Sequence, residues 1–91
     1  MKKAYQEVKN SIIMENRDLF VGNLGPHITE DELLEQFSYF GRVRFFRLIK
    51  RKGIAFVGMA RAQDAYNARL GLNGIQLNGY HIRVVEARPN K

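Results

Sequence analysis

Three short stretches of the chain are rich in apolar, β-branched and aromatic residues whose side chains alternate between two faces, which indicates β-strands. The first stretch covers residues 18–22 and ends at the turn-forming sequence Asn23–Leu24–Gly25–Pro26. The second covers residues 43–49, and a tight basic turn at 50–53 leads into the third, residues 54–59. The alternation therefore predicts one strand, a long intervening segment, and then two strands joined as a hairpin.

Within the second and third strands the alternation also predicts which side chains share a face. In residues 43–49 it places Phe46 and Leu48 on one face and Arg47 and Ile49 on the other. In residues 54–59 it separates Ala55, Val57 and Met59 from Ile54 and Phe56.

The segment between the first two strands has the features of a capped helix. Thr29 followed by Glu32 forms a capping box, in which each side chain accepts a hydrogen bond from the other residue's backbone N–H. Gly41 stands where a left-handed residue would close the last turn. Apolar residues recur at helical spacing at Leu33, Leu34, Phe37 and Phe40.

A second helix is predicted over residues 61–72, and it ends at Asn73–Gly74. Its narrow stripe of small and apolar residues consists of Ala62, Ala65, Ala68 and Leu72. Asn78–Gly79 is a strong two-residue turn signal that leads into a final strand, residues 81–87. The complete order is therefore strand, helix, strand, strand, helix, strand.

This order defines an α+β fold, the ferredoxin-like split βαβ arrangement. Two helices should cover one face of a four-stranded antiparallel sheet, and the other face should stay open to solvent. Because the fold hosts enzymes, metal carriers and binding modules alike, it does not by itself give a function.

Composition narrows the possible functions. The 91 residues fit one domain, and 15 Lys and Arg against 9 Asp and Glu give a net charge of +6. That excess favours polyanionic partners, because clustered cations displace counterions from phosphate backbones. The chain has no cysteine and only 2 histidines, so we expect no disulfide, no metal site and no cofactor. We expect neither a membrane span nor a small-molecule substrate.

Two segments of the chain resemble the conserved peptides of RNA-recognition motifs. Residues 52–59, Lys-Gly-Ile-Ala-Phe-Val-Gly-Met, resemble the RNP octapeptide, and residues 19–24, Leu-Phe-Val-Gly-Asn-Leu, match the hexapeptide throughout. The resemblance extends over residues 18–89 and is closest to the short-loop members of the family.

The resemblance implies that Phe20 and Phe56 lie side by side on the open face, where each ring stacks a base of single-stranded RNA. Lys52, at the first position of the octapeptide, would neutralise a phosphate. Ile54 occupies the position where the family usually carries a third stacking aromatic residue. An aliphatic side chain covers a sugar or a base edge but does not stack, so we expect weaker binding than in a member with all three aromatic residues.

The remaining residues assigned to RNA binding lie on or beside the same face. A run with six cations in eleven positions begins at Arg42 and ends at Lys52. Its alternative interpretation is a solvated edge strand that resists aggregation, and the roles of Arg44 and Arg51 stay open. The further RNA-binding candidates are Asn23, Arg47, Ile49, Arg83, Val85 and Arg88.

We divide the chain into an N-terminal extension at 1–17, partly helical or disordered, an RNA-recognition motif at 18–89 and a tail at 90–91. A protein partner is an additional expectation, through the extension or the helices. Family membership suggests a nuclear, or else cytoplasmic, role in messenger-RNA processing or splicing.

Other functions remain to be weighed. The main rival is a protein-interaction version of the fold that binds a peptide or a partner domain through the sheet or the first helix. An acylphosphatase-like enzyme would need an arginine in the loop after the first strand, and residues 23–28 contain none. We therefore expect no catalysis. Single-stranded DNA stays open, because stacking tolerates either sugar.

Overall fold

A computed structural model describes residues 17–87 of the chain. The expected N-terminal extension, except Arg17, and the candidate Arg88 lie outside these residues. The elements are β1 (Asp18–Gly22), α2 (Glu30–Ser38), β2 (Val43–Ile49), the 3-10 turn η1 (Lys50–Lys52), β3 (Ile54–Met59), α3 (Ala62–Leu72), β4 (Gln76–Leu77), β5 (Tyr80–His81) and β6 (Arg83–Glu86).

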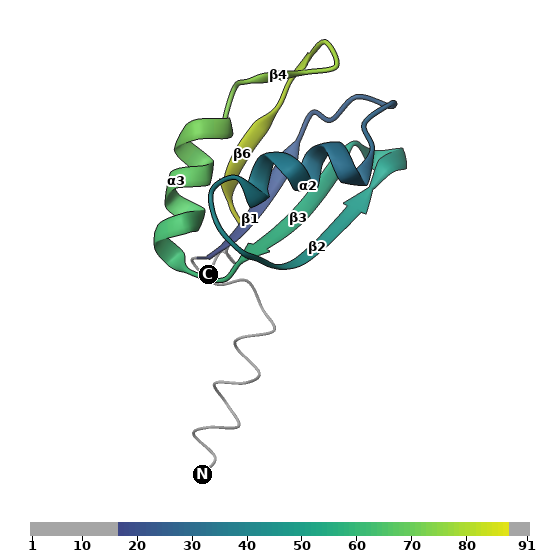
Figure 1. Cartoon of the computed structure of the whole chain (residues 1–91). Coiled ribbons are helices and arrows are strands. Elements are labelled where there is room, and N and C mark those ends of the chain that lie inside the picture. The colour runs from purple at the N-terminus through teal and green to yellow at the C-terminus, as the bar shows by residue number, and fades with distance from the viewer. Residues whose placement is uncertain (1–16, 88–91) are drawn as a thin grey trace.

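Four strands form one antiparallel sheet in the order β2-β3-β1-β6. Both helices cover the same face of this sheet, and no helix formed by residues 17–87 lies on its other face (Figure 1). The predicted α+β, ferredoxin-like arrangement is therefore confirmed. Within the described residues, neither helix has both the length and the apolar character needed to cross a membrane.

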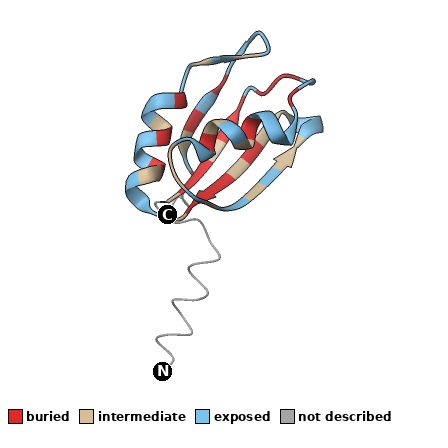
Figure 2. Ribbon diagram, in the orientation of Figure 1, coloured by how far each residue is buried: buried red, intermediate tan, exposed pale blue. Residues whose placement is uncertain are grey.

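The core lies between the sheet and the two helices, where the buried residues of both layers face each other (Figure 2). The predicted inward face of β3 is confirmed, because Ala55, Val57 and Met59 have no exposed surface. Phe37 of α2 is also fully buried, and Phe46 and Leu48 of β2 pack against the same cluster. Because the inward-facing residues of the sheet and of the helices form the core, the opposite face of the sheet lies outside it.

The capping box that begins α2 is present as predicted. The backbone N–H of Glu32 donates to the Thr29 hydroxyl oxygen (3.1 Å), and the N–H of Thr29 donates to Oε1 of Glu32 (3.0 Å). Two hydrogen bonds hold the pKa of Glu32 below its ordinary value of 4.5. The one from the Thr29 N–H has the larger effect, and the one from the side-chain amide of Asn78 (3.2 Å) has the next largest. The Glu32 carboxylate is therefore held in place at the start of α2, and its lowered pKa favours the charged form.

The predicted end of α2 was wrong. The helix ends at Ser38, its C-cap Tyr39 is right-handed helical, and Gly41 has a φ of 158°, near extended and far from left-handed. A Cβ at Gly41 would lie 2.3 Å from Oδ2 of Asp64. Glycine is needed here because the chain passes close to the start of α3.

The helix α3 packs through the small residues that the sequence indicated, with one exception. Ala65, Ala68 and Leu72 are buried, whereas Ala62 is exposed in the first turn. Asn73 then caps the end of the helix, since its N–H donates to the carbonyl of Arg69 (3.1 Å). Its side-chain oxygen also accepts from the N–H of Val84 (2.9 Å), which ties α3 to β6.

The final strand predicted over residues 81–87 is interrupted. β5 pairs with β4 in a separate two-stranded hairpin, and only β6 joins the main sheet. Asn78 and Gly79 have φ values of 52° and 87°, the positive values that a type I′ turn requires. Between β5 and β6, Ile82 is buried, and its N–H donates to the carbonyl of Ile75 (2.9 Å).

The turn between β2 and β3 depends on Gly53. This residue has a φ of 66° and caps η1, and its carbonyl accepts from the N–H of Leu24 (3.0 Å). A Cβ at Gly53 would lie 2.9 Å from the carbonyl oxygen of Leu24. Glycine is thus required both for the left-handed conformation and for the close approach, which brings the basic turn against the end of β1.

Candidate functional site

The open sheet face carries two phenylalanines on its two central strands. The Cα atoms of Phe20 in β1 and Phe56 in β3 are direct partners across the antiparallel pair. Their ring centroids lie 5.5 Å apart with an interplanar angle of 63°, an edge-to-face contact. Both rings are half-buried, so each keeps accessible surface on the side away from the helices.

The register places further candidates in the same row across the sheet. Val85 of β6 is the partner of Phe20, and Arg47 of β2 is the partner of Phe56. The row therefore reads Val85, Phe20, Phe56, Arg47 from one edge of the sheet to the other. Two rings lie in the middle, with an aliphatic side chain at one end and a cation at the other.

A second row lies toward the basic turn. Ile54 of β3 pairs with Ile49 of β2, and both side chains are half-buried. Arg83 of β6 is exposed and pairs with Gly22 of β1. This row has aliphatic surface at the position where the family resemblance leads one to expect an aromatic ring.

Three exposed cations surround the two rows: Arg47, Arg83 and, in η1, Lys52. Among residues 17–87, none of the three is paired with a carboxylate. The acidic residues of the first turn of α2 lie on the helical layer instead: Glu30, Asp31 and Glu32. In the described residues these basic groups therefore surround the open face, and the acidic groups of α2 lie behind the sheet.

Asn23 has a structural task in addition to any role in binding. It adopts a left-handed conformation with a φ of 59°, and its side-chain amide donates to the carbonyl of His81 (2.8 Å). This contact ties the end of β1 to the β4–β5 hairpin. Its assignment to RNA binding stays a prediction.

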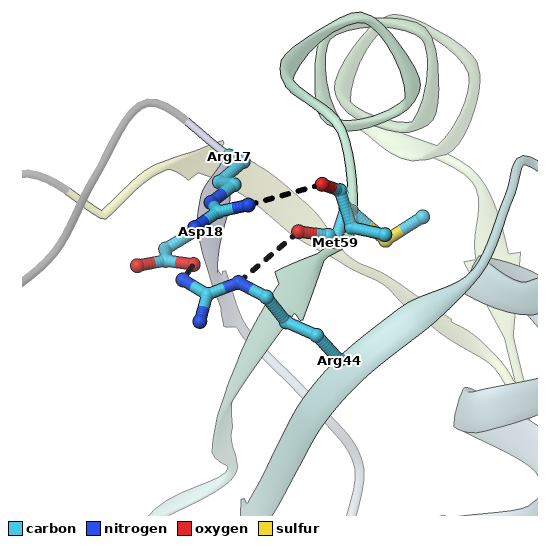
Figure 3. A network of polar contacts seen from close by, with 5 residues as sticks. Arg17, Asp18, Arg44 and Met59 are labelled. Atoms are coloured by element: carbon cyan, nitrogen blue, oxygen red, sulfur yellow. Dashed lines mark hydrogen bonds and ion pairs between the residues drawn. The ribbon is translucent and has the colours of Figure 1, made fainter. Parts of the chain in front are cut away.

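A partly buried ion pair at one end of the sheet escaped the sequence analysis (Figure 3). Nη2 of Arg44 lies 2.6 Å from Oδ1 of Asp18, whose side chain is 2% exposed, and Nε of Arg44 donates to the carbonyl of Met59 (3.2 Å). Nη1 of Arg17 donates to the carbonyl of Ala60 (3.1 Å). Arg44, whose role the sequence left open, therefore fastens β2 to β1 and β3.

A third aromatic residue of the open face, Phe45, was also missed. Phe45 is the partner of Gly58, in the same register that pairs residues 46–49 of β2 with β3, and the register shifts only before it, between Val43 and Phe45. Its ring is 36% exposed. The signal was available, because the alternation that assigned Arg47 and Ile49 to the open face extends back by one step to Phe45.

The fold and the site define a sheet-and-helix module with an aromatic and basic face, and comparison with known proteins gives its family. The family model described as RNA recognition motif matches residues 19–83. The chain belongs to the RNA recognition motif family.

Individual relatives agree with this membership. The cytotoxic granule-associated RNA binding protein tiar-1 of Caenorhabditis elegans is 33% identical over 82 residues, which cover 90% of this chain. The polyadenylate-binding protein RBP45A of Arabidopsis thaliana is 39% identical over 77 residues, which cover 84% of it. This chain spans only 20% of the length of each of these two proteins.

Among solved structures, the Sxl-lethal protein/RNA complex superposes with a TM-score of 0.74 at 30% identity. The match covers 85% of this chain and 50% of the chain in that complex.

Proposed function

We propose that this chain binds single-stranded RNA by stacking bases on the open sheet face. The observation that carries the proposal is the pair of accessible rings, Phe20 and Phe56, 5.5 Å apart on adjacent central strands. An aromatic ring on a rigid sheet stacks any base, because every base has a π-face. Membership of the family and the RNA-binding relatives support the same conclusion.

The other side chains of the face receive supporting roles in this proposal. Arg47, Lys52 and Arg83 hold phosphates or base edges, since they are exposed and within the described residues have no carboxylate partner. The aliphatic positions Ile49, Ile54 and Val85 cover sugars or base edges beside the rings. Asn23 and Arg88 complete the proposed set on the strength of the family resemblance.

The place of this domain in a larger protein is a further part of the proposal. We infer a nuclear role in messenger-RNA processing or splicing, on the strength of membership of the RNA recognition motif family. Within that protein we assign the RNA-recognition motif to residues 18–89 and assign no catalytic step to it.

A titration with single-stranded and double-stranded RNA of the same sequence tests the proposed function. We expect saturable binding of the single strand and much weaker binding of the duplex, because paired bases cannot reach the rings. Single-stranded DNA in the same experiment measures the contribution of the 2′-hydroxyl groups. Equal affinity for duplex and single strand would show that charge alone drives the interaction and would contradict stacking.

Protein binding through the same fold is the second candidate, and one observation favours it. A groove of about 530 Å³ lies beside the edge strand β2, lined by Leu34, Ser38, Gly41, Arg42, Val43, Phe45 and Phe46. If the chain binds no RNA at low salt, protein binding becomes the better-supported function. This groove or the sheet face would then be the peptide-binding surface.

The proposal also predicts how Lys52 contributes to the salt dependence of binding. For single strands, the slope of log K against log salt concentration is about −0.7 for each phosphate that a cation neutralises. Lys52→Ala should therefore make the slope shallower by about 0.7 and weaken binding to all sequences alike. Affinities measured over a series of salt concentrations give the slope.

A matched control for Lys52 is Arg61→Ala, which also removes one charge. Arg61 is exposed at the start of α3, where its Nε lies 3.8 Å from Oδ2 of Asp64. Its removal should leave the slope unchanged. Equal changes in the two variants would mean that net charge, and not a contact at Lys52, determines the salt dependence.

A further inference from the structure

The open face carries a third ring that the sequence motifs do not assign. Phe45 of β2 pairs with Gly58 of β3, while Phe56 lies two residues away from Gly58 on the same strand. Residues two apart on a strand share a face, so Phe45 and Phe56 project from the same side of the sheet. They are diagonal neighbours across adjacent strands, a relation that separates positions by about 7–8 Å.

Gly58 allows the Phe45 ring to lie against the sheet. A Cβ at this position would lie 2.3 and 2.5 Å from two ring carbons of Phe45, so that any other residue would push the ring away. The ring therefore rests directly over the backbone of β3. Its 36% exposure makes it more accessible than the half-buried rings of Phe20 and Phe56.

Arg44 lies with its guanidinium over the ring of Phe45. Its guanidinium carbon lies 5.1 Å from the centroid of the Phe45 ring, within the range of a cation–π contact. The guanidinium is itself fixed by Asp18 at 2.6 Å and by the carbonyl of Met59 at 3.2 Å. Because arginine has five N–H donors, these two contacts leave donors for an additional acceptor next to the ring.

We propose that Phe45 forms a third nucleobase-binding position, with the adjacent Arg44 guanidinium available to a phosphate or to a base edge. This inference rests on the proposed function and extends it toward the edge strand β2. The three rings lie on three adjacent strands, β1, β3 and β2, so the RNA crosses the sheet from its centre to this edge. Phe45 thereby supplies a third aromatic ring on the sheet, in place of the one that the family usually carries at the position of Ile54.

The spacing of the rings also indicates that the bound RNA is a single strand with unstacked bases. Phe20 and Phe56 are 5.5 Å apart and the diagonal step to Phe45 is about 7–8 Å, whereas stacked bases along one strand of a duplex are about 3.4 Å apart. Three bases on these rings are therefore separated from one another. Only an unstacked single strand meets that requirement.

Fluorescence tests the third position directly, because the chain contains no tryptophan. Phe45→Trp introduces a single indole at the proposed position, and random-sequence single-stranded RNA should quench its emission when a base stacks on it. Tyr66→Trp is the matched control, since Tyr66 is 50% exposed on α3, on the opposite side of the sheet. Its emission should stay unchanged at saturating RNA.

Affinity measurements complete the test. We expect Phe45→Ala to weaken RNA binding by at least about fivefold, and Phe45→Tyr to bind as the wild type does, because tyrosine retains the ring. Phe45→Leu, which keeps apolar volume without a ring, should resemble alanine, and thermal unfolding verifies that each variant is folded.

If Phe20→Ala weakens binding while Phe45→Ala binds within twofold of the wild type and the indole at position 45 is not quenched, the platform ends at Phe20 and Phe56. The third position is then refuted and the proposed function stands. If wild type binds no RNA at all, both are refuted.

Discussion

Replacing both Phe20 and Phe56 by alanine should weaken single-stranded RNA binding by about 2–6 kcal/mol, the largest effect on binding that we expect. Each ring contributes about 1–3 kcal/mol by stacking one base. The two contributions are coupled, since the rings touch edge to face at 5.5 Å, and loss of one ring frees the other to move. Equilibrium titrations of the single and double variants give these free energies and their coupling.

The fold should survive these substitutions, because both rings are half-buried on the face opposite the helices. The edge-to-face contact contributes only about 0.5–1.5 kcal/mol to stability. Phe20→Tyr and Phe56→Tyr are the matched controls, as they keep the ring and should retain affinity. Wild-type affinity in the folded double alanine variant would refute base stacking on this face.

Replacing Phe37 by alanine should lower the free energy of unfolding by about 3–5 kcal/mol, the largest effect on stability that we expect. Phe37 has no exposed surface and lies between α2 and the sheet, so that truncation leaves a cavity in the core. Small domains are stable by only about 5–15 kcal/mol. Thermal denaturation followed by circular dichroism should show the midpoint fall by roughly 12–40 °C.

Tyr39→Ala is the matched control for Phe37, because it truncates an aromatic residue two positions further along the chain. Tyr39 is 85% exposed, and its ring makes an edge-to-face contact with the ring of Phe40, with centroids 5.5 Å apart. Its replacement should change stability by less than about 1 kcal/mol. A similar loss in both variants would contradict the placement of the core between α2 and the sheet.

Most of the fold could be predicted from the sequence because local signals and the global arrangement agree. Alternation placed Ala55 and Val57 inward, and the Thr29–Glu32 capping box located the start of α2. Such signals depend on neighbours within four residues, and these are visible in the sequence itself.

Features that depend on distant parts of the chain could not be predicted in this way. Gly41 suggested a left-handed helix end, but its true constraint is the side chain of Asp64 on another helix. The split of the final strand depends on Ile82, which bonds back to Ile75. The ion pair of Arg44 with Asp18 joins residues 26 positions apart, a distance at which sequence patterns carry no information.

The candidate site likewise has a part that the sequence predicted and a part that it did not. The motifs identified Phe20 and Phe56 as neighbours, and the register confirms that their Cα atoms are partners. Phe45 belongs to no motif, although the alternation of β2 extends to it, and its place over Gly58 is set by the pairing of β2 with β3. The family pattern thus located the centre of the face, while the contact of Phe45 with Gly58 at its edge came from the pairing of β2 with β3.

One nuclear magnetic resonance titration tests the stacking claim most directly: the ring protons of every phenylalanine and tyrosine are followed while single-stranded RNA is added. Bases stacked on the sheet should move the ring resonances of Phe20 and Phe56 strongly upfield and leave those of Tyr66, on α3, unchanged. Large shifts confined to residues of the groove beside β2, with Phe20 and Phe56 unmoved at saturation, would contradict the account.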